Sequence, residues 1–351
     1  MSFVETRTAL RMPPEWAPHE RTWMAWPSSG YALGDDPQEA ELARATWAAV
    51  ARAIAAFEPV TMVVDPAAAA DAARHLDPRV HVMHAPLDDA WMRDMGPTFV
   101  HDEHGDLYAI DWVFNGWGAQ EWATWTRDAR IARTVAASAG AGVIASPMVN
   151  EGGGFHVDGE GTALITRTVQ LDEHRNPGWD AAAVEAELTR TLGVERVIWL
   201  PRGLTRDYER YGTRGHVDVV ATFASPGRVL VHLQQDPGHP DHAVSHEIAE
   251  LLRGETDARG RRLEVVEVPA PRATHDDDGP VDYSYINHAV VNGGVVLGGF
   301  GEPEADARAA AIVGAAYGGR RVELVDARPL FARGGGVHCI TQQQPATPRT
   351  R

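Results

Sequence analysis

Short glycine-rich turns that carry polar residues recur along this chain, and they constrain its fold more than any other feature of the sequence. They follow strand-like runs at intervals of about 50 to 70 residues, which indicates one supersecondary unit used roughly five times around an axis. The units share little sequence, so this prediction depends on their spacing. The turns are Trp26-Pro27, Arg93 to Pro97, Glu151 to Gly154, Gly215 to Asp218, Asn292 to Gly294 and Gly334 to Cys339.

Runs rich in Val, Ile and Thr alternate with segments of helical periodicity, which is typical of an α/β protein. The predicted helices, Gln38 to Phe57, Ala181 to Leu192 and His242 to Arg253, each end before a proline or a glycine. No low-complexity or Pro-rich break separates the segments, so we expect one domain over residues 1–351. The predicted strands are Val60 to Val64, Gly142 to Ile144, Ala163 to Thr166, Val197 to Leu200, Val229 to Leu233, Leu263 to Val268 and Val295 to Leu297.

The charged residues exclude several classes of function. Acids outnumber bases by 49 to 32, and this formal charge of -17 argues against binding to nucleic acid, which requires clustered bases. All of the bases are arginine. Without lysine the chain cannot form a Schiff base or a P-loop phosphate site. An anionic protein can instead concentrate small cations at its clefts.

Cysteine usage and hydropathy place the chain in a broad class. Cys339 is the single cysteine, so an internal disulfide is excluded. The start of the sequence lacks the apolar core of a signal peptide, and no stretch approaches the roughly 18 apolar residues of a membrane helix. We therefore expect a cytoplasmic enzyme or binding protein without a membrane partner.

Three glycines, Gly334 to Gly336, come shortly before Cys339. Glycines let the backbone approach a ligand closely, which side chains would otherwise prevent. A lone cysteine is by default a small buried apolar residue. The glycine run favours the alternative, a nucleophile on a tight turn, which needs a base from elsewhere in the chain.

A candidate base lies in Gly215-His216-Val217-Asp218. In an extended segment His216 and Asp218 lie on the same face, and a carboxylate beside an imidazole orients it and favours its protonation. The same spacing recurs at His156 and Asp158. A structural or metal-binding explanation of either pair therefore stays open at this point.

Two other turns carry carboxylates. Asp94 stands before a Gly-Pro turn with Trp91 nearby, a pattern that fits either a packed turn or a carboxylate and an aromatic face presented to a planar cation. Glu151 precedes three glycines, where it either caps the turn or supports a catalytic histidine. His239, His242 and His246 resemble a metal-binding face, but a surface helix is the favoured explanation.

Taken together, these blocks resemble the agmatine deiminase family, also called agmatine iminohydrolases, which is related to the bacterial type peptidyl-arginine deiminases of the guanidino-group modifying superfamily. The likeness spans nearly the whole chain, and the ending His338 to Pro345 is highly specific. The matching segments, in order, are Met12 to Glu20, Trp26-Pro27, Trp91 to Pro97, Asn115 to Gly118, Glu151 to Gly161, Arg175 to Pro177, Ile198 to Leu204, Gly215 to Asp218 and Gly334 to Pro345.

The resemblance implies a five-bladed pseudo-symmetric α/β propeller of the pentein type. It also implies that Cys339 is the nucleophile and His216 the general acid and base, while Asp94 and Asp218 clasp a guanidinium and Glu151 orients the histidine. With Trp91 as a further substrate contact, the expected reaction is hydrolysis of agmatine to N-carbamoylputrescine, in putrescine biosynthesis. No cofactor or metal is expected, and a homodimer is a possible assembly.

One region departs from the family pattern. The family has an acid-rich segment before the histidine motif and Asn after it, whereas here Arg210 and Arg214 precede it and Val219 follows. These arginines would repel the terminal amine of agmatine and attract a carboxylate, so free arginine or a peptidyl arginine is the alternative substrate. A metal-dependent amidohydrolase, suggested by the 16 histidines, and a non-catalytic binding module are the rival classes.

Overall fold

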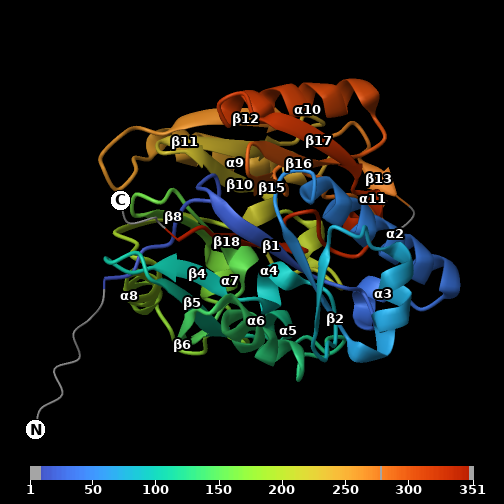
Figure 1. Ribbon diagram of the computed structural model, residues 1–351. Coiled ribbons are helices and arrows are strands. Elements are labelled where there is room, and N and C mark those ends of the chain that lie inside the picture. Colours follow the sequence, from blue (N-terminus) through green and yellow to red (C-terminus); the bar gives the residue numbers. More distant parts are fainter. Residues whose placement is uncertain (1–8, 277–278, 348–351) are drawn as a thin grey trace, which may run out of the picture.

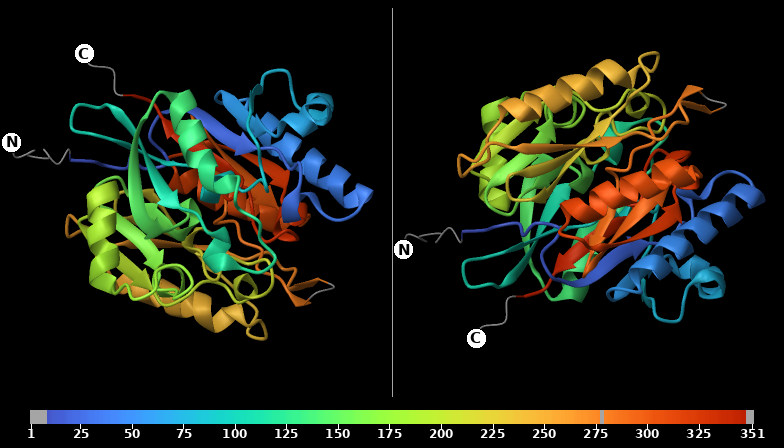
Figure 2. Two further views of the ribbon diagram at one scale, coloured as in Figure 1. Left: turned by 90° about the horizontal axis from the view of Figure 1, so that it is seen from below. Right: turned by 90° about the horizontal axis from the view of Figure 1, so that it is seen from above.

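The computed structural model describes residues 9–276 and 279–347, and the rest of the predicted 1–351 domain lies outside the described residues. Within these ranges the strands form five sheets of three or four strands and one two-stranded sheet. The longer helices lie outside the sheets (Figure 1 and Figure 2). None of the described helices has the length and apolar character needed to cross a bilayer. The fold is therefore α/β, as the sequence predicts.

Four of the sheets share one topology. The first strand pairs antiparallel with the second, and a helix then leads to a third strand that runs parallel to the second. These helices are α6 (Ile131–Ala139), α8 (Ala181–Leu192), α9 (Asp241–Gly254) and α10 (Pro303–Ala316). The strands are β4 (Thr98–His101), β5 (Leu107–Val113) and β6 (Gly142–Val149); β7 (Phe155–Val157), β8 (Thr162–Thr166) and β9 (Arg196–Leu200); β10 (Ala221–Ser225), β11 (Arg228–Leu233) and β12 (Glu264–Pro269); β15 (Ala289–Val291), β16 (Gly294–Gly299) and β17 (Arg321–Asp326).

The remaining large sheet joins the first and last strands of the described chain. β18 (Thr341–Pro345) pairs antiparallel with β1 (His19–Ala25). The chain then passes through helix α2 (Pro37–Ile54) into β2 (Val60–Val64), which runs parallel to β1. β3 (His81–His84) extends the sheet in parallel to β2. This sheet therefore has the same antiparallel and parallel order as the other four, but it is assembled from segments that are far apart in the sequence.

Shorter elements connect the strands and the longer helices. They are α1 (Gly30–Leu33), α3 (Ala69–His75), α4 (Met92–Met95), α5 (Gly116–Ala119), α7 (Arg167–Gln170) and α11 (Arg328–Phe331), the strands β13 (His275–Asp276) and β14 (Gly279–Pro280), and 3-10 turns at Pro66–Ala68, Asp128–Arg130, Gly152–Gly154, Arg206–Tyr208 and Val217–Val219.

Capping residues determine where the helices begin and end. The Asp180 side chain accepts a hydrogen bond from the Ala183 N–H at the start of α8, and Gly193 ends the helix with a φ of 70°. The predicted helix Ala181 to Leu192 is confirmed. α2 ends at Ile54, before the predicted Phe57, because the Phe57 N–H donates to the Ile54 carbonyl in a tighter final turn.

Six turns are predicted to occupy the same position in a repeated unit, and for two of them this prediction is wrong. The other four lie between sheets, each just before the first strand of a sheet, whereas Asn292 to Gly294 closes the hairpin between β15 and β16. Trp26-Pro27 leaves β1 within a sheet unit. Residues 282–288 occupy the corresponding position before β15. An Asn-Gly hairpin has the same composition as the other turns, so glycine content alone does not separate the two.

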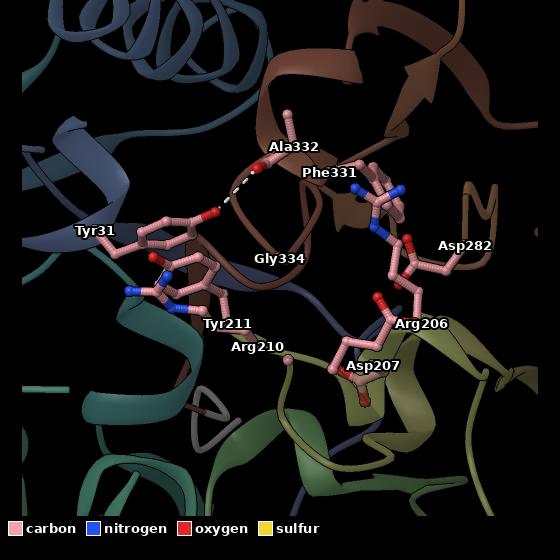
Figure 3. Close-up of a pocket in the computed structure, with 11 residues that line it drawn as sticks. Tyr31, Arg206, Asp207, Arg210, Tyr211, Asp282, Phe331, Ala332 and Gly334 are labelled. Carbon is pink, nitrogen blue, oxygen red and sulfur yellow. Dashed lines mark hydrogen bonds between the residues drawn. The ribbon is translucent and has the colours of Figure 1, made fainter. Parts of the chain in front are cut away.

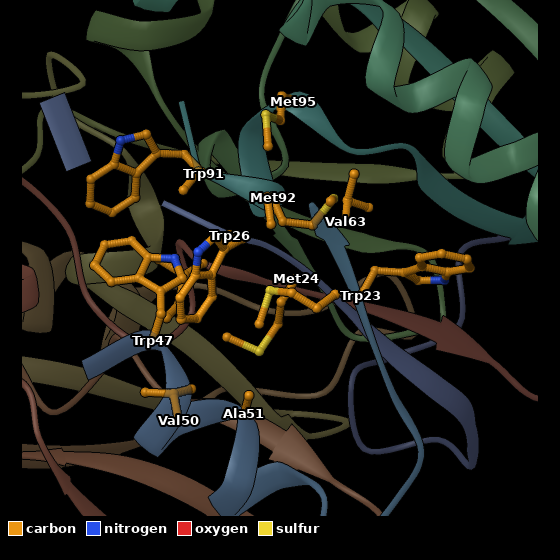
Figure 4. Close-up of a cluster of buried hydrophobic side chains, with 14 of the residues drawn as sticks. Trp23, Met24, Trp26, Trp47, Val50, Ala51, Val63, Trp91, Met92 and Met95 are labelled. Atoms are coloured by element: carbon orange, nitrogen blue, oxygen red, sulfur yellow. The ribbon is translucent and has the colours of Figure 1, made fainter. Parts of the chain in front are cut away.

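A cluster of large apolar side chains lies beneath the sheet of β1 and β2 (Figure 4). Trp23, Trp26 and Trp47 are at most 1% exposed. Met92 and Met95 of α4 belong to the same cluster, so the apolar side of this short helix is fixed by packing. The intervening residue Asp94 is thereby held at the edge of the cluster.

Candidate active site

The turns between the sheets bring distant side chains together around Gly153. A β-carbon added at Gly153 would lie 2.5 Å from His216 Nδ1, 3.0 Å from Asp218 Oδ2 and 3.1 Å from Asp94 Oδ1. A real β-carbon does not tolerate the shortest of these distances, so glycine is required there. Three of the predicted site residues therefore converge on one point of the backbone.

His216 is buried and held by a carboxylate on one side. Its Nε2 lies 3.2 Å from Glu151 Oε2, while its Nδ1 lies 3.8 Å from Asp94 Oδ1 and has no hydrogen-bond partner among the described residues. Burial alone lowers the pKa of His216, but Asp94, Glu151 and Asp218 outweigh burial and raise the pKa to about 9. His216 is therefore a cation at neutral pH with one nitrogen open to the site.

Glu151 is kept ionised by a buried arginine. Arg175 Nε donates to both Glu151 oxygens at 3.0 Å, and Arg175 also donates to Asp172 Oδ2 and to the Thr213 carbonyl. Burial raises the pKa of Glu151, but Arg175 and His216 together bring the pKa below its usual value. Arg175 belongs to a motif that the sequence singles out, but no role for it follows from the sequence alone.

Cys339 lies beside one of the two carboxylates. Its Sγ is 3.5 Å from Asp218 Oδ2 and accepts a hydrogen bond from Asn287 Nδ2 at 3.2 Å. Burial, with Asp218 and Asp94 nearby, raises the pKa of Cys339 well above its usual value. The resting group is therefore a thiol, in contact with the polar site and not enclosed by apolar side chains alone.

The extended conformation predicted for His216 to Asp218 is wrong. Val217–Val219 form a 3-10 turn. The cause is Asp207, whose Oδ2 accepts the backbone N–H groups of Gly215 at 2.6 Å and His216 at 3.0 Å, so the backbone turns immediately after it. Both side chains still face Gly153, as expected, although the backbone geometry differs.

Asp94 and Asp218 have opposite electrostatic environments. Burial raises the pKa of Asp94 to about 6, helped by Asp218 and Glu151, although His216 and the Trp117 Nε1 donor at 2.8 Å oppose the shift. Burial also acts to raise the pKa of Asp218, but His338 outweighs it and the pKa falls. The Oδ1 atom of Asp218 is buried without a partner among the described residues.

The structure places Trp91 in the apolar cluster. It is 5% exposed and meets Trp47 edge-on, with ring centroids 5.7 Å apart. A β-carbon at Gly335 would lie 2.6 Å from the Trp91 ring, so the ring packs beneath the turn that carries Cys339. The aromatic side chain that bonds to a site carboxylate is Trp117, from the matching segment Asn115 to Gly118. Substrate contact by Trp91 stays a prediction.

An open cavity of about 300 Å³ lies next to the glycine run (Figure 3). Tyr31 and Tyr211 stack across one side of it with centroids 3.6 Å apart. Burial, with Asp207 nearby, raises the pKa of Asp282 on the other side to about 7, although Arg206 opposes the shift. Tyr211 has a φ of 76°, a strained conformation of the kind that clusters at functional sites.

The two arginines that depart from the family pattern lie apart. Arg214 donates to Asp172 Oδ2 at 3.3 Å and does not line the cavity. Arg210 does line it, and its guanidinium lies 4.5 Å from the centre of the Tyr211 ring. Arg206, also in the lining, pairs with Asp276 at 2.8 Å. The positive charge that the sequence predicts near the site is therefore largely engaged by protein groups.

Asn287 is a site residue that no pattern in the sequence singles out. Its Nδ2 donates to Cys339 Sγ, and its Oδ1 accepts the His338 N–H at 2.9 Å. It lies in residues 282–288, which contain no glycine. The other site turns each lie just before the first strand of a sheet. The position of Asn287 just before β15 is therefore the signal that would have identified it.

The histidines that resemble a metal face do not form one. No group of three or more His, Cys, Asp or Glu residues in the described ranges is arranged to hold a metal ion. His242 and His246 lie on α9, but His239 precedes the helix and is 4% exposed, so placing it on a surface helix is wrong. Its Nδ1 accepts the Asp241 N–H because it belongs to the turn that begins α9.

The fold and the site together place the chain in the class of α/β deiminases. Its structure resembles that of the agmatine deiminase of Enterococcus faecalis, with a TM-score of 0.90, 31% identity, and coverage of 99% of this chain and 100% of that one. The chain belongs to the Porphyromonas-type peptidyl-arginine deiminase family, whose model matches residues 11–345.

Two relatives by sequence support this assignment. A protein of Streptomyces coelicolor is 62% identical over 339 residues, which cover 96% of this chain and 99% of the relative. The agmatine deiminase of Pseudomonas fluorescens is 38% identical over 362 aligned residues, which cover 96% of each chain. The likeness therefore extends over the whole site and is not confined to one motif.

Proposed function

We propose that this protein hydrolyses agmatine to N-carbamoylputrescine and ammonia through a covalent thiouronium on Cys339. The observation that carries the proposal is the convergence of His216, Asp218 and Asp94 on Gly153 with the Cys339 thiol against Asp218. Two buried atoms there, His216 Nδ1 and Asp218 Oδ1, have no hydrogen-bond partner among the described residues, which fits a polar ligand at that point. A guanidinium supplies the N–H donors that Asp218 lacks, and its amino group becomes the ammonia that His216 protonates.

The carboxylates prepare both the substrate and the nucleophile. Asp94 and Asp218 accept charge-assisted hydrogen bonds from the guanidinium nitrogens and present its central carbon to Cys339 Sγ. Their charges are also part of what keeps the pKa of Cys339 high in the free protein. A bound guanidinium cation neutralises them, so substrate binding itself favours loss of the thiol proton to solvent water.

His216 then acts twice. After Sγ attacks the carbon, cationic His216 donates its Nδ1 proton to the departing ammonia and becomes neutral. The same nitrogen accepts a proton from water, and the resulting hydroxide attacks the thiouronium carbon. Collapse of that adduct breaks the carbon–sulfur bond and passes its hydroxyl proton to the departing Sγ. This releases the neutral ureido product and returns Cys339 and His216 to their starting charges. Glu151 holds Nε2 throughout.

The architecture supports a finer description of the fold. We infer that the five similar sheets are the blades of a pseudo-symmetric α/β propeller of the pentein type, closed by the pairing of β1 with β18, in a single domain over residues 1–351. We further propose a cytoplasmic enzyme of putrescine biosynthesis that forms a homodimer. Size-exclusion chromatography with light scattering tests the dimer, which a monomeric mass would contradict.

The charges of the cavity favour agmatine over substrates with a carboxylate, because both arginines that line it are engaged by other protein groups. Asp282 and Glu209 line it, Arg206 is paired with Asp276, and the Arg210 guanidinium lies over the Tyr211 ring. We expect kcat/KM for agmatine to exceed that for L-arginine or a peptide with a C-terminal arginine by at least about tenfold. Ureido-product formation from the three compounds measures this. Asp282→Asn should reduce the preference, and a preference of the wild-type protein for either carboxylate substrate would contradict the proposal.

The charge of Asp94 predicts an acid limit on activity. The pKa of Asp94 is raised to about 6, mainly by burial, so in the free protein its carboxylate is charged only above that pH. We expect kcat/KM to fall about tenfold for each pH unit below 6, because a neutral carboxyl loses its bond to the cation. In kcat the limit should move to lower pH, since bound guanidinium lowers the pKa of Asp94. A kcat/KM that is constant down to about pH 5 would contradict this assignment.

A further inference from the structure

His338, the neighbour of Cys339 in the chain, is buried and has no part in the reaction described above. Its Nδ1 lies 2.8 Å from Asp218 Oδ2, and its Nε2 lies 2.8 Å from Glu15 Oε1. Glu15 comes from the segment before β1, outside the repeated units. A histidine between two carboxylates, one of them in the site, connects this segment to the reacting groups.

The two contacts define the charge of the ring. A carboxylate only accepts hydrogen bonds, whereas a neutral imidazole has a single N–H to donate. Both contacts are satisfied together only when His338 is an imidazolium, unless one carboxyl holds the proton. Burial raises the pKa of Glu15, but His338 and Arg93 bring it well below its usual value, and the pKa of Asp218 is also lowered. The proton therefore belongs to His338.

We propose that Glu15 and His338 are positioning residues of the deimination reaction: Glu15 holds His338 as a cation, and that cation fixes Asp218 with Oδ1 turned toward the guanidinium. This inference rests on the proposed function. His338 occupies Oδ2 of Asp218, so only Oδ1 is left for the substrate. The positive charge also offsets the carboxylates that oppose formation of the Cys339 thiolate.

The charges that surround His338 support this assignment. Arg93 of α4 donates to Glu15 Oε1 at 3.2 Å and opposes a second cation nearby. His156 of β7 accepts the Phe223 N–H on its Nδ1, which is therefore unprotonated. Burial lowers the pKa of His288, before β15, to about 4, so that ring is neutral too. The charges next to His338 are thus Glu15, Asp218 and Arg93, and a neutral His338 would leave them one negative charge in excess.

Glu15→Gln tests the proposal through its pH profile. The variant keeps a side chain of the same size but removes the charge that holds His338 protonated, so the ring should titrate near the ordinary value of about 6.5. We expect kcat/KM for agmatine to be within about threefold of wild type at pH 6, and at least about tenfold lower than wild type at pH 8.5. A reduction by one factor at every pH, or an unchanged profile, would overturn the proposal.

Glu58→Gln is the matched control. Glu58 Oε1 lies 3.1 Å from His19 Nδ1 in a second buried pair of a histidine and a glutamate. His19 Nε2 lies 2.8 Å from the Glu15 backbone carbonyl, but the Glu58 carboxylate itself accepts from Thr22 and Asn292 and makes no hydrogen bond to Asp218, His338 or Cys339 among the described residues. This variant should lose stability without changing the shape of the pH profile. Wild-type protein that releases no ammonia from agmatine at any pH would contradict the proposed function, which separates that failure from failure of this inference.

A spectroscopic measurement keeps the inference testable if Glu15→Gln does not fold. The protein is labelled with ¹⁵N-histidine and carries His216→Asn, which removes one histidine expected to stay cationic at high pH. His19 and His75 also face acceptors at both ring nitrogens, so a second sample with the additional change His338→Asn assigns the signal. We expect a ring with two protonated nitrogens at about pH 8.5, two units above the usual pKa of histidine, whose signal is lost in the second sample. An imidazolium spectrum that His338→Asn leaves unchanged would overturn the proposal without any assay of activity.

Discussion

Ammonia release from agmatine should fall by at least about 10⁴-fold in Cys339→Ser, the scale at which removal of a nucleophile abolishes covalent catalysis. A serine hydroxyl needs a base to accept its proton before it can attack. His216 cannot serve, because its pKa of about 9 keeps it protonated at neutral pH. The carboxylates that clasp the guanidinium remain in place, so agmatine binding by calorimetry should change by no more than a few fold. Steady-state ammonia release measures the loss.

Two controls separate this outcome from the rival functions. A haloacetamidine should add mass to Cys339 in the wild-type protein, with protection by agmatine and without reaction in Cys339→Ser. A metal-dependent amidohydrolase would instead be inactivated by a chelator and be indifferent to Cys339→Ser. We expect the wild-type rate to be unchanged after treatment with a chelator. Ammonia release that survives Cys339→Ser would exclude the covalent mechanism.

His216→Asn should lower kcat by about 10² to 10⁴-fold, the usual contribution of a general acid and base. Asparagine can still donate to Glu151, but it cannot deliver a proton to ammonia or remove one from water. Both chemical steps should therefore slow. Rapid-quench mass spectrometry on Cys339 reports the first step, and ammonia release in the steady state reports the complete cycle.

His156→Asn is the matched control, because His156 and His216 are each followed in the sequence by Val and Asp. His156 lies 2.7 Å from Thr222 Oγ1 and accepts the Phe223 N–H, so its ring is engaged by β10 and not by the reacting groups. Its loss should reduce stability but leave kcat within about threefold. Equal losses of kcat in the two variants would contradict the role given to His216.

The site residues that could be predicted from the sequence are those that lie in or beside glycine-rich turns. Cys339, Asp94 and Glu151 each lie within three residues of a glycine, and the resemblance to the deiminase family is what assigns them to one site. Arg175 and Asn287 could not be selected in this way. Arg175 acts by pairing with Glu151, and Asn287 by contacting Cys339, and both contacts exist only after the sheets have assembled.

In the fold, too, elements that depend on long-range contacts could not be predicted from the sequence. The Val-rich strand β2 is predicted with its observed bounds, and the other predicted strands differ from the observed ones at one or both ends. β18 (Thr341–Pro345), by contrast, has no apolar periodicity at all. β18 becomes a strand because β1 pairs with it, and Trp23 Nε1 donates to Gln344 Oε1 at 3.0 Å. α10 is rich in alanine with little amphipathic pattern, so its place depends on packing against its own sheet.

The pairing of β1 with β18 also affects how the protein matures. A ribosome makes β18 long after β1, so the sheet that steadies the Cys339 turn cannot form until β18 has been made. Contacts of such large sequence separation form slowly, because a long loop must close before they can stabilise the fold. A nascent or truncated polypeptide that lacks β18 therefore carries an unassembled site, and catalytic competence arises only after this strand is synthesised and paired.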